Sequence, residues 1–133
     1  MGLEIVANKD KTLTVVAKQG TTWVLTLTLT NADNSPVDLT GYSARGQIRP
    51  SYTSPTVVAS FTTSITANVV TCLVPASITA NVPAYKTSIA IKTPPKWEEV
   101  QGCYVFDIEI YNTDGYVERV AEGVWYVDPE VTR

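Results

Sequence analysis

One run of alternating residues constrains the fold more than any other feature of this sequence. Trp23, Leu25, Leu27 and Leu29 occupy every second position of residues 21–30, and Thr or Val fills the other positions. Successive side chains of a β-strand point to opposite faces, so a period of two predicts a strand with one buried face. A strand of this kind is typical of an antiparallel sheet that covers a core on one side.

Similar strand candidates recur along the chain, separated by turn residues. Asp114-Gly115 predicts a tight hairpin, because this pair readily adopts positive φ, and Glu122-Gly123 is expected to form a bulge. The one helical piece expected is a turn or two within residues 75–83, which begin and end with proline. The predicted strands are residues 12–17, 21–30, 42–49, 56–61, 69–74, 103–111, 116–121 and 124–129, with residues 62–68 as a connection and residues 92–99 as a loop.

This number and spacing of strands predict an all-β protein, an antiparallel two-sheet β-sandwich of immunoglobulin-like type. Residues 1–11 are expected to form an extended N-terminal arm, and residues 12–133 a single sandwich domain. Composition agrees, since the 133 residues include 19 Thr and 18 Val. Both are β-branched and favour strands over helices.

Composition also excludes several classes of function. The chain has no His, which removes histidine-based triads and histidine-containing metal sites. Its net charge of −3 and pI near 4.8 argue against a nucleic-acid-binding surface. Neither a run of about 20 apolar residues nor a secretory signal is present. We therefore expect a soluble protein made in a cytoplasm, with no nucleic-acid or membrane partner.

The two cysteines, Cys72 and Cys103, both lie in apolar sequence. An inter-sheet disulfide is one interpretation, and two buried, reduced thiols are the interpretation favoured for a cytosolic protein. Two cysteines without histidine do not make a thiolate zinc site. We expect no metal, no cofactor and no catalytic residues.

Two groups of charged residues could still carry chemistry. Asp107 and Glu109 lie two apart on one strand and point the same way, as an acid–base or cation-binding pair would. The alternative is a solvated polar face. Arg45 and Arg49 share a face with Gln47 and could grip a carboxylate or phosphate. The favoured interpretation is that they pair with acidic residues of the adjacent strand, such as Asp107 or Glu109, or contact another protein.

The aromatic residues divide between core and surface. Trp23 and Trp125 lie in strand-like sequence and are expected in the core. Trp97 lies in a proline-rich loop and is either a lid over the core or an interface anchor. A carbohydrate-binding module is a separate interpretation, in which Tyr52, Tyr85 and Trp97 stack on sugar rings.

Several segments form an ordered series that carries a family resemblance. In chain order they are residues 19–27, residues 36–42, residues 44–49, residues 104–109 and the terminal residues 122–133, which end in Pro-Glu-Val-Thr-Arg. The series resembles a family of bacteriophage virion proteins. These are small β-sandwich domains of tail and baseplate components, including the N-terminal domain of upper baseplate proteins. The resemblance covers about residues 18–133 and is weakest between about 53 and 100.

The resemblance implies a non-enzymatic structural protein of the virion, made in the host cytoplasm. Its expected place is a tail or baseplate, as an adaptor for host-attachment fibres. A capsid decoration (cement) protein is the alternative in the same class, and an enzyme using Asp107 and Glu109 is a third class. The implied partners are other virion proteins and copies of the chain, and a host-surface glycan reached through an attached fibre.

The interface candidates are expected mainly at the chain ends and in loops. Free chain ends usually fray, so we expect a neighbouring subunit to hold them, and residues 3–7 could add a strand to its sheet. The alternative is that this arm docks on its own sheet. The candidates are Leu3, Ile5, Tyr52, Trp97 and Arg133.

Overall fold

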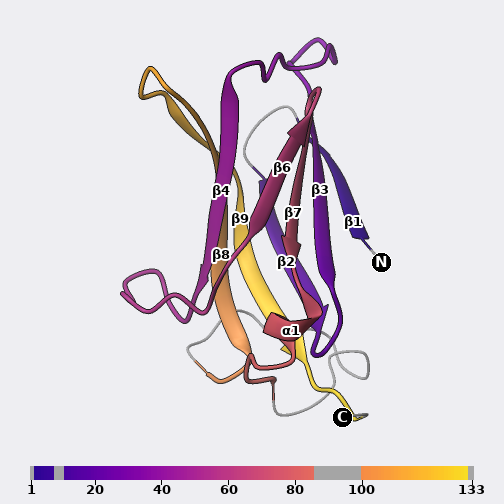
Figure 1. The fold of residues 1–133 in the computed structure, drawn as a ribbon, viewed down its shortest axis with the longest axis vertical. Helices are drawn as coiled ribbons and strands as arrows, with labels where there is room; N and C mark the ends of the chain where they lie inside the picture. The colour runs from indigo at the N-terminus through magenta and orange to yellow at the C-terminus, as the bar shows by residue number, and fades with distance from the viewer. Residues whose placement is uncertain (1, 8–10, 86–99, 132–133) are drawn as a thin grey trace.

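Two β-sheets lie face to face in this computed structural model, which describes residues 2–7, 11–85 and 100–131 (Figure 1). One sheet has four strands in the order β1-β3-β7-β6, and the other has five in the order β2-β9-β8-β4-β5. The predicted all-β sandwich is therefore confirmed. The elements are β1 (Gly2–Ala7), β2 (Lys11–Lys18), β3 (Trp23–Leu29), β4 (Tyr42–Arg49), β5 (Ala59–Ser60), β6 (Thr62–Thr66), β7 (Val69–Val74), the short helix α1 (Ala76–Thr79), β8 (Cys103–Asn112) and β9 (Val117–Asp128).

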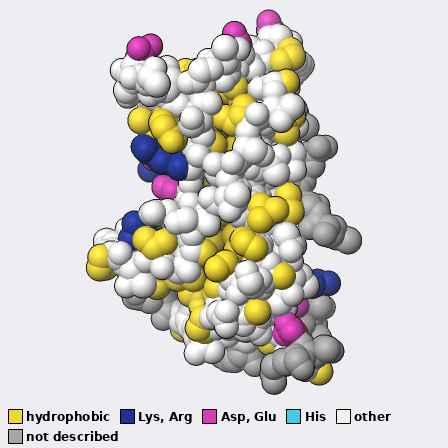
Figure 2. All heavy atoms as spheres, viewed as in Figure 1, with side chains coloured by type: hydrophobic (Ala, Val, Ile, Leu, Met, Phe, Trp, Pro, Cys, Tyr) yellow, Lys and Arg dark blue, Asp and Glu magenta, His cyan; other side chains and the backbone are white. Residues whose placement is uncertain are grey.

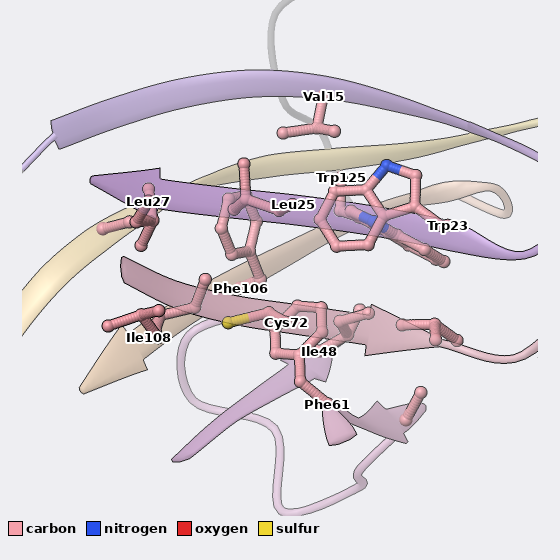
Figure 3. Close-up of a cluster of buried hydrophobic side chains, with 14 of the residues drawn as sticks. Val15, Trp23, Leu25, Leu27, Ile48, Phe61, Cys72, Phe106, Ile108 and Trp125 are labelled. Atoms are coloured by element: carbon pink, nitrogen blue, oxygen red, sulfur yellow. The ribbon is translucent and has the colours of Figure 1, made fainter. Parts of the chain in front are cut away.

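The core fills the space between the sheets with inward side chains from both of them (Figure 3). In β3 the burial alternates residue by residue, and Trp23, Leu25, Leu27 and Leu29 are all buried, as the sequence predicts. They face the inward side chains of the other sheet, which include Ile48, Phe106, Ile108 and Trp125. Removal of this apolar surface from water is the main favourable term in folding.

Trp23 and Trp125 both lie in the core, as expected. The Trp125 indole is fully buried, and its Nε1–H is the only buried side-chain polar atom of the described residues without a hydrogen-bond partner. Buried polar groups are normally paired, so this donor represents a local cost.

Two strand pairings are parallel, which the prediction of a wholly antiparallel sandwich missed. β1 runs parallel to β3, with Gly2 opposite Val24, and β2 runs parallel to β9, with Lys11 opposite Ala121. The other strand pairs are antiparallel. The N-terminal segment therefore docks on a sheet of its own chain, which is the alternative to strand addition onto a neighbour. It contributes one strand to each sheet in turn: β1 lies beside β3 and β2 lies beside β9, neither of which is its neighbour in sequence.

The prediction for residues 56–68 was wrong in detail. Only Ala59–Ser60 of the expected strand pairs with β4, and the expected connection contains β6, which pairs with β7. The hairpin between β6 and β7 turns at Ala67, whose φ is +54°. β6 is an edge strand with a single large apolar residue, Ile65, so its sequence lacks the alternation that marks a half-buried strand. Residues 62–66 form a strand because they pair with β7, and the local sequence pattern does not predict this.

The predicted bulge also lies elsewhere. The β8–β9 hairpin follows the expected Asp114-Gly115 turn, but its register shifts where Ile108 pairs with Ala121 and Glu109 with Arg119, which leaves Val120 as the extra residue. Gly123 stays in register opposite both Phe106 and Leu13. A Cβ atom there would overlap the Leu13 carbonyl oxygen. The glycine is thus required by the close approach of β2 and not by a bulge.

Both cysteines are buried and form no disulfide, in agreement with the favoured interpretation. Cys72 lies in the core between the sheets, whereas Cys103 belongs to a small cluster with Tyr85 and Tyr126. Burial raises the pKa of the Cys72 thiol to about 12, which keeps it protonated and unreactive.

Candidate functional site

The charged residues that the sequence singles out lie together on the outer face of the five-stranded sheet. The register of β4, β8 and β9 arranges this face in three rows across the strands. The first row is Arg45, Glu109 and Arg119; the second is Gln47, Asp107 and Glu122; the third is Arg49, Val105 and Val124. We call the seven polar side chains of these rows the charged face.

Arg45 is bound on two sides. Its Nε donates to Glu109 Oε1 at 2.9 Å, and its guanidinium carbon lies 4.5 Å from the centre of the Tyr111 ring. The predicted pairing of Arg45 with an acidic residue of the adjacent strand is therefore confirmed. The pair remains partly open to water, with side-chain exposures of 55% and 28%, so its energetic contribution is small.

Arg119 connects the two remaining carboxylates. Its guanidinium NH1 donates to Glu122 Oε1 at 3.2 Å, and its Nε lies 3.9 Å from Asp107 Oδ2. The second distance is an ion-pair contact that is too long for a hydrogen bond. Arg119 thus offsets the repulsion between Asp107 and Glu122, which lie directly opposite each other in the ladder.

Arg49 makes contacts of a different kind. Its guanidinium donates to Gln47 Oε1 at 2.7 Å and to the Ser54 carbonyl oxygen at 3.0 Å. These hydrogen-bond partners of Arg49 are neutral oxygens and not the acidic neighbour expected from the sequence. This arrangement ties the loop after β4 to the charged face.

Asp107 is the most perturbed carboxylate of the charged face. Partial burial raises its pKa above the usual range, and the negative charge of Glu109 adds to the effect. Arg119, Arg49 and Arg45 oppose the rise without cancelling it. Among the described residues, no hydrogen bond reaches the Asp107 carboxylate, so its ionised form is poorly compensated.

A depression of about 330 Å³ opens over the charged face, and its lining includes residues of all three rows. Val105 and Asp107 belong to its lining from β8, and Ser51 and Tyr52 from the loop after β4. Figure 2 shows dark blue and magenta side chains next to one another over β4 at the left of the molecule, whereas the surface over β6 and β7 is white and yellow. Further charged side chains appear at the top and at the lower right of this view.

Sequence reasoning missed Arg119 and Glu122 as members of this face. The signal that could have found them is the Asp114-Gly115 turn, since a hairpin places the residues of its two arms opposite each other. Counting outwards from that turn without the bulge would pair Asp107 with Ala121 instead of Glu122. The bulge at Val120 corrects the register by one residue.

The other candidate residues differ in their exposure and in their place in the fold. The Tyr52 side chain is 66% exposed, whereas Tyr85 is only 9% exposed and packs edge-on against Tyr126. The prediction that Tyr85 could stack on a sugar is therefore wrong, because its ring is covered. Leu3 and Ile5 lie in β1. Trp97, Arg133 and the predicted loop at residues 92–99 lie outside the described residues.

Two kinds of feature are absent from the described part of the chain. It contains no group of three or more Cys, Asp or Glu side chains arranged to hold a metal ion. It also contains no helix with the length and apolar character needed to cross a membrane. No protein-family model matches the chain, and a search of curated proteins found no match.

Proposed function

We propose that the chain is a non-enzymatic structural protein of a bacteriophage virion, placed in the tail or baseplate as an adaptor for host-attachment fibres. The observation that carries the non-enzymatic part is the state of the Asp107 and Glu109 pair. Both carboxylates lie on an open sheet face, where Glu109 is hydrogen-bonded to Arg45 and Asp107 faces Arg119. Catalysis requires a nucleophile or base held by an orienting group; Glu109 is engaged by Arg45, and among the described residues no side chain orients the Asp107 carboxylate through a hydrogen bond.

The family resemblance supports the virion part of the proposal. Four of its segments correspond to β3, β4, β8 and the end of β9. These strands lie in the interior of the two sheets or carry the central hairpin, so the resembling residues build the framework of the sandwich. The weakly resembling middle of the chain contains the edge strands β5 and β6 and also the interior strand β7.

Surface composition supports a protein that packs against neighbours. Charged residues make up only 17% of the chain, which lowers the desolvation cost of broad contacts. Several large apolar side chains of the described residues are exposed, in loops, in strands and in α1. They are Val16, Tyr52, Val57, Ile78, Val100, Tyr116, Val117 and Val131.

Fractionation of virus particles tests the proposal. Particles from a culture that produces this chain would be separated into heads and tails, and each fraction analysed by mass spectrometry. We expect the chain in the tail fraction, and cryo-electron microscopy of tails should place it around a threefold or sixfold axis. Its presence on heads alone would favour the cement alternative, and its absence from both fractions would contradict a virion role.

A further inference from the structure

We propose that the depression beside the charged face binds an uncharged saccharide, with the Asp107 carboxylate accepting hydrogen bonds from sugar hydroxyls and the Tyr52 ring packing on the apolar face of the sugar. The proposal concerns the isolated chain and does not depend on a place in a virion. It also differs from the sugar site expected from the sequence, because Tyr85 is buried elsewhere.

The first argument is an acceptor without donors. The Asp107 side chain is 43% exposed, and its nearest cationic atom among the described residues is Arg119 Nε at 3.9 Å. Burial also raises its pKa, as expected for a carboxylate that has lost water without gaining hydrogen bonds. Sugar hydroxyls are strong donors and would supply what the protein does not.

The second argument is a donor beside that acceptor. Gln47 lies directly opposite Asp107 in the β4–β8 ladder. Its Oε1 accepts from Arg49, so among the described residues its side-chain hydrogen bonding uses only the oxygen end of the amide. The two amide N–H groups are donors available to a ligand. An acceptor and a donor side by side match two adjacent hydroxyls of a sugar ring, each of which both donates and accepts.

The third argument is the apolar part of the lining. Tyr52 contributes an exposed aromatic ring at the depression, and Val105 is a buried apolar residue of the same lining. Small-molecule sites typically combine apolar and aromatic walls with a few placed polar groups, and their volumes begin near 300 Å³. A volume of about 330 Å³ suits a small ligand of one or two rings.

The fourth argument is charge balance, which selects an uncharged ligand. The charged face carries three arginines and three carboxylates, so its formal charge is zero. An anion would meet Asp107, Glu109 and Glu122, and a cation would meet the arginines. A neutral polyol meets no net repulsion and can use both kinds of group.

Titration of the purified full chain with neutral disaccharides tests the proposal. Lactose, maltose, cellobiose and N,N′-diacetylchitobiose would be added to ¹⁵N-labelled protein, with amide shifts followed by NMR. We expect at least one of them to cause saturable shifts confined to residues 47–52, 105–109 and 119–122. Sialyllactose serves as the charged counterpart of lactose, and inorganic phosphate as a simple anion; both should bind more weakly.

Variants separate a binding role from a structural one. Tyr52→Ala should weaken binding about fivefold, since an aromatic contact of this kind contributes roughly 1 kcal/mol. Tyr52→Phe, which keeps the ring, should restore most of the affinity, and Asp107→Asn should weaken binding because the carboxylate acceptor is lost. Tyr116→Ala is the matched control, since Tyr116 is also exposed but lies outside the depression.

Three results would overturn the proposal. They are the absence of saturable shifts with every neutral disaccharide, undiminished binding by Tyr52→Ala, and stronger binding of sialyllactose or phosphate than of the neutral sugars. Thermal unfolding of each variant shows that it is folded. Because all measurements use the isolated chain, a negative result leaves the tail assignment untouched, and mass spectrometry of particles leaves the sugar site untouched.

Discussion

The indole ring of Trp23 stands at 89° to that of Trp125, with ring centroids 5.9 Å apart. The first residue belongs to β3 of the four-stranded sheet and the second to β9 of the five-stranded sheet. Edge-to-face aromatic pairs add about 0.5–1.5 kcal/mol to the energy of burial. This contact therefore joins the two sheets at the centre of the core.

Truncation of Trp125 should reveal how much of its contribution is packing. Trp125→Ala should lower the free energy of unfolding by about 3–5 kcal/mol, because it leaves a large cavity. Trp125→Phe should cost less than half of that, since the indole N–H has no hydrogen bond to lose. Urea unfolding measures both, and equal losses in the two variants would show that the N–H has a partner in solution.

The Arg45–Glu109 ion pair should show a small, salt-dependent coupling. A double-mutant cycle with Arg45→Ala and Glu109→Ala should give about 0.5 kcal/mol, because both side chains are partly exposed. The coupling should fall further in about 1 M salt, where screening is strong. Arg49 and Glu122, which share no ion pair, form the control cycle, and an equal coupling there would contradict a specific contact.

Asp107→Asn should stabilise the protein at neutral pH. The pKa of Asp107 is raised in the folded state, so the folded state binds its proton more tightly than the unfolded state does. Ionisation therefore favours unfolding, and its destabilising effect is fully present above the folded pKa. The variant should have the higher melting temperature at about pH 7, and the difference should shrink as pH falls through the folded pKa towards the unfolded value.

The Asp107→Asn substitution separates the effect of this residue on ligand binding from its effect on stability. If Asp107 serves a ligand, Asp107→Asn gains stability and loses saccharide affinity, which is the usual trade-off at a functional site. A variant that is less stable at neutral pH would contradict the raised pKa.

Gly123→Ala should separate β2 from β9. The new methyl group would overlap the Leu13 carbonyl oxygen, and the residue has a φ of +155°, which an L side chain rarely adopts. We expect a loss of about 3 kcal/mol or more, and faster hydrogen exchange of β2 amides. Gly41→Ala is the control, because Gly41 has a φ of +81° but no neighbour within 4 Å of an added Cβ. If both variants lost the same free energy of unfolding, the positive φ alone would explain the effect, and the contact with Leu13 would not be needed.

Neither cysteine should react with a thiol reagent while the protein is folded. Cys72 and Cys103 are both buried, and the pKa of Cys72 is raised to about 12. Because the thiolate is the reactive form, 5,5′-dithiobis(2-nitrobenzoate) should label both residues only after denaturation. Labelling at the rate of a small thiol under native conditions would show that one of them is accessible.

The strands with strong alternation could be predicted from the sequence because their pattern records the burial of one face. β3, β4 and β8 are of this kind, and the turn at Asp114-Gly115 follows from the φ preference of glycine. β6 could not be predicted in this way. Residues 62–66 carry almost no apolar pattern and become a strand by pairing with β7.

The fixed period of two along a strand is enough to predict that Asp107 and Glu109 lie on the same side of their strand, and that Arg45 and Arg49 lie on the same side of theirs. Which residues meet across the strands was decided by the tertiary structure. The bulge at Val120 shifts the hairpin register by one, which brings Glu122 instead of Ala121 opposite Asp107. A register is set by the packing of whole sheets and not by any one segment, so the charged face and its depression exist only in the folded chain.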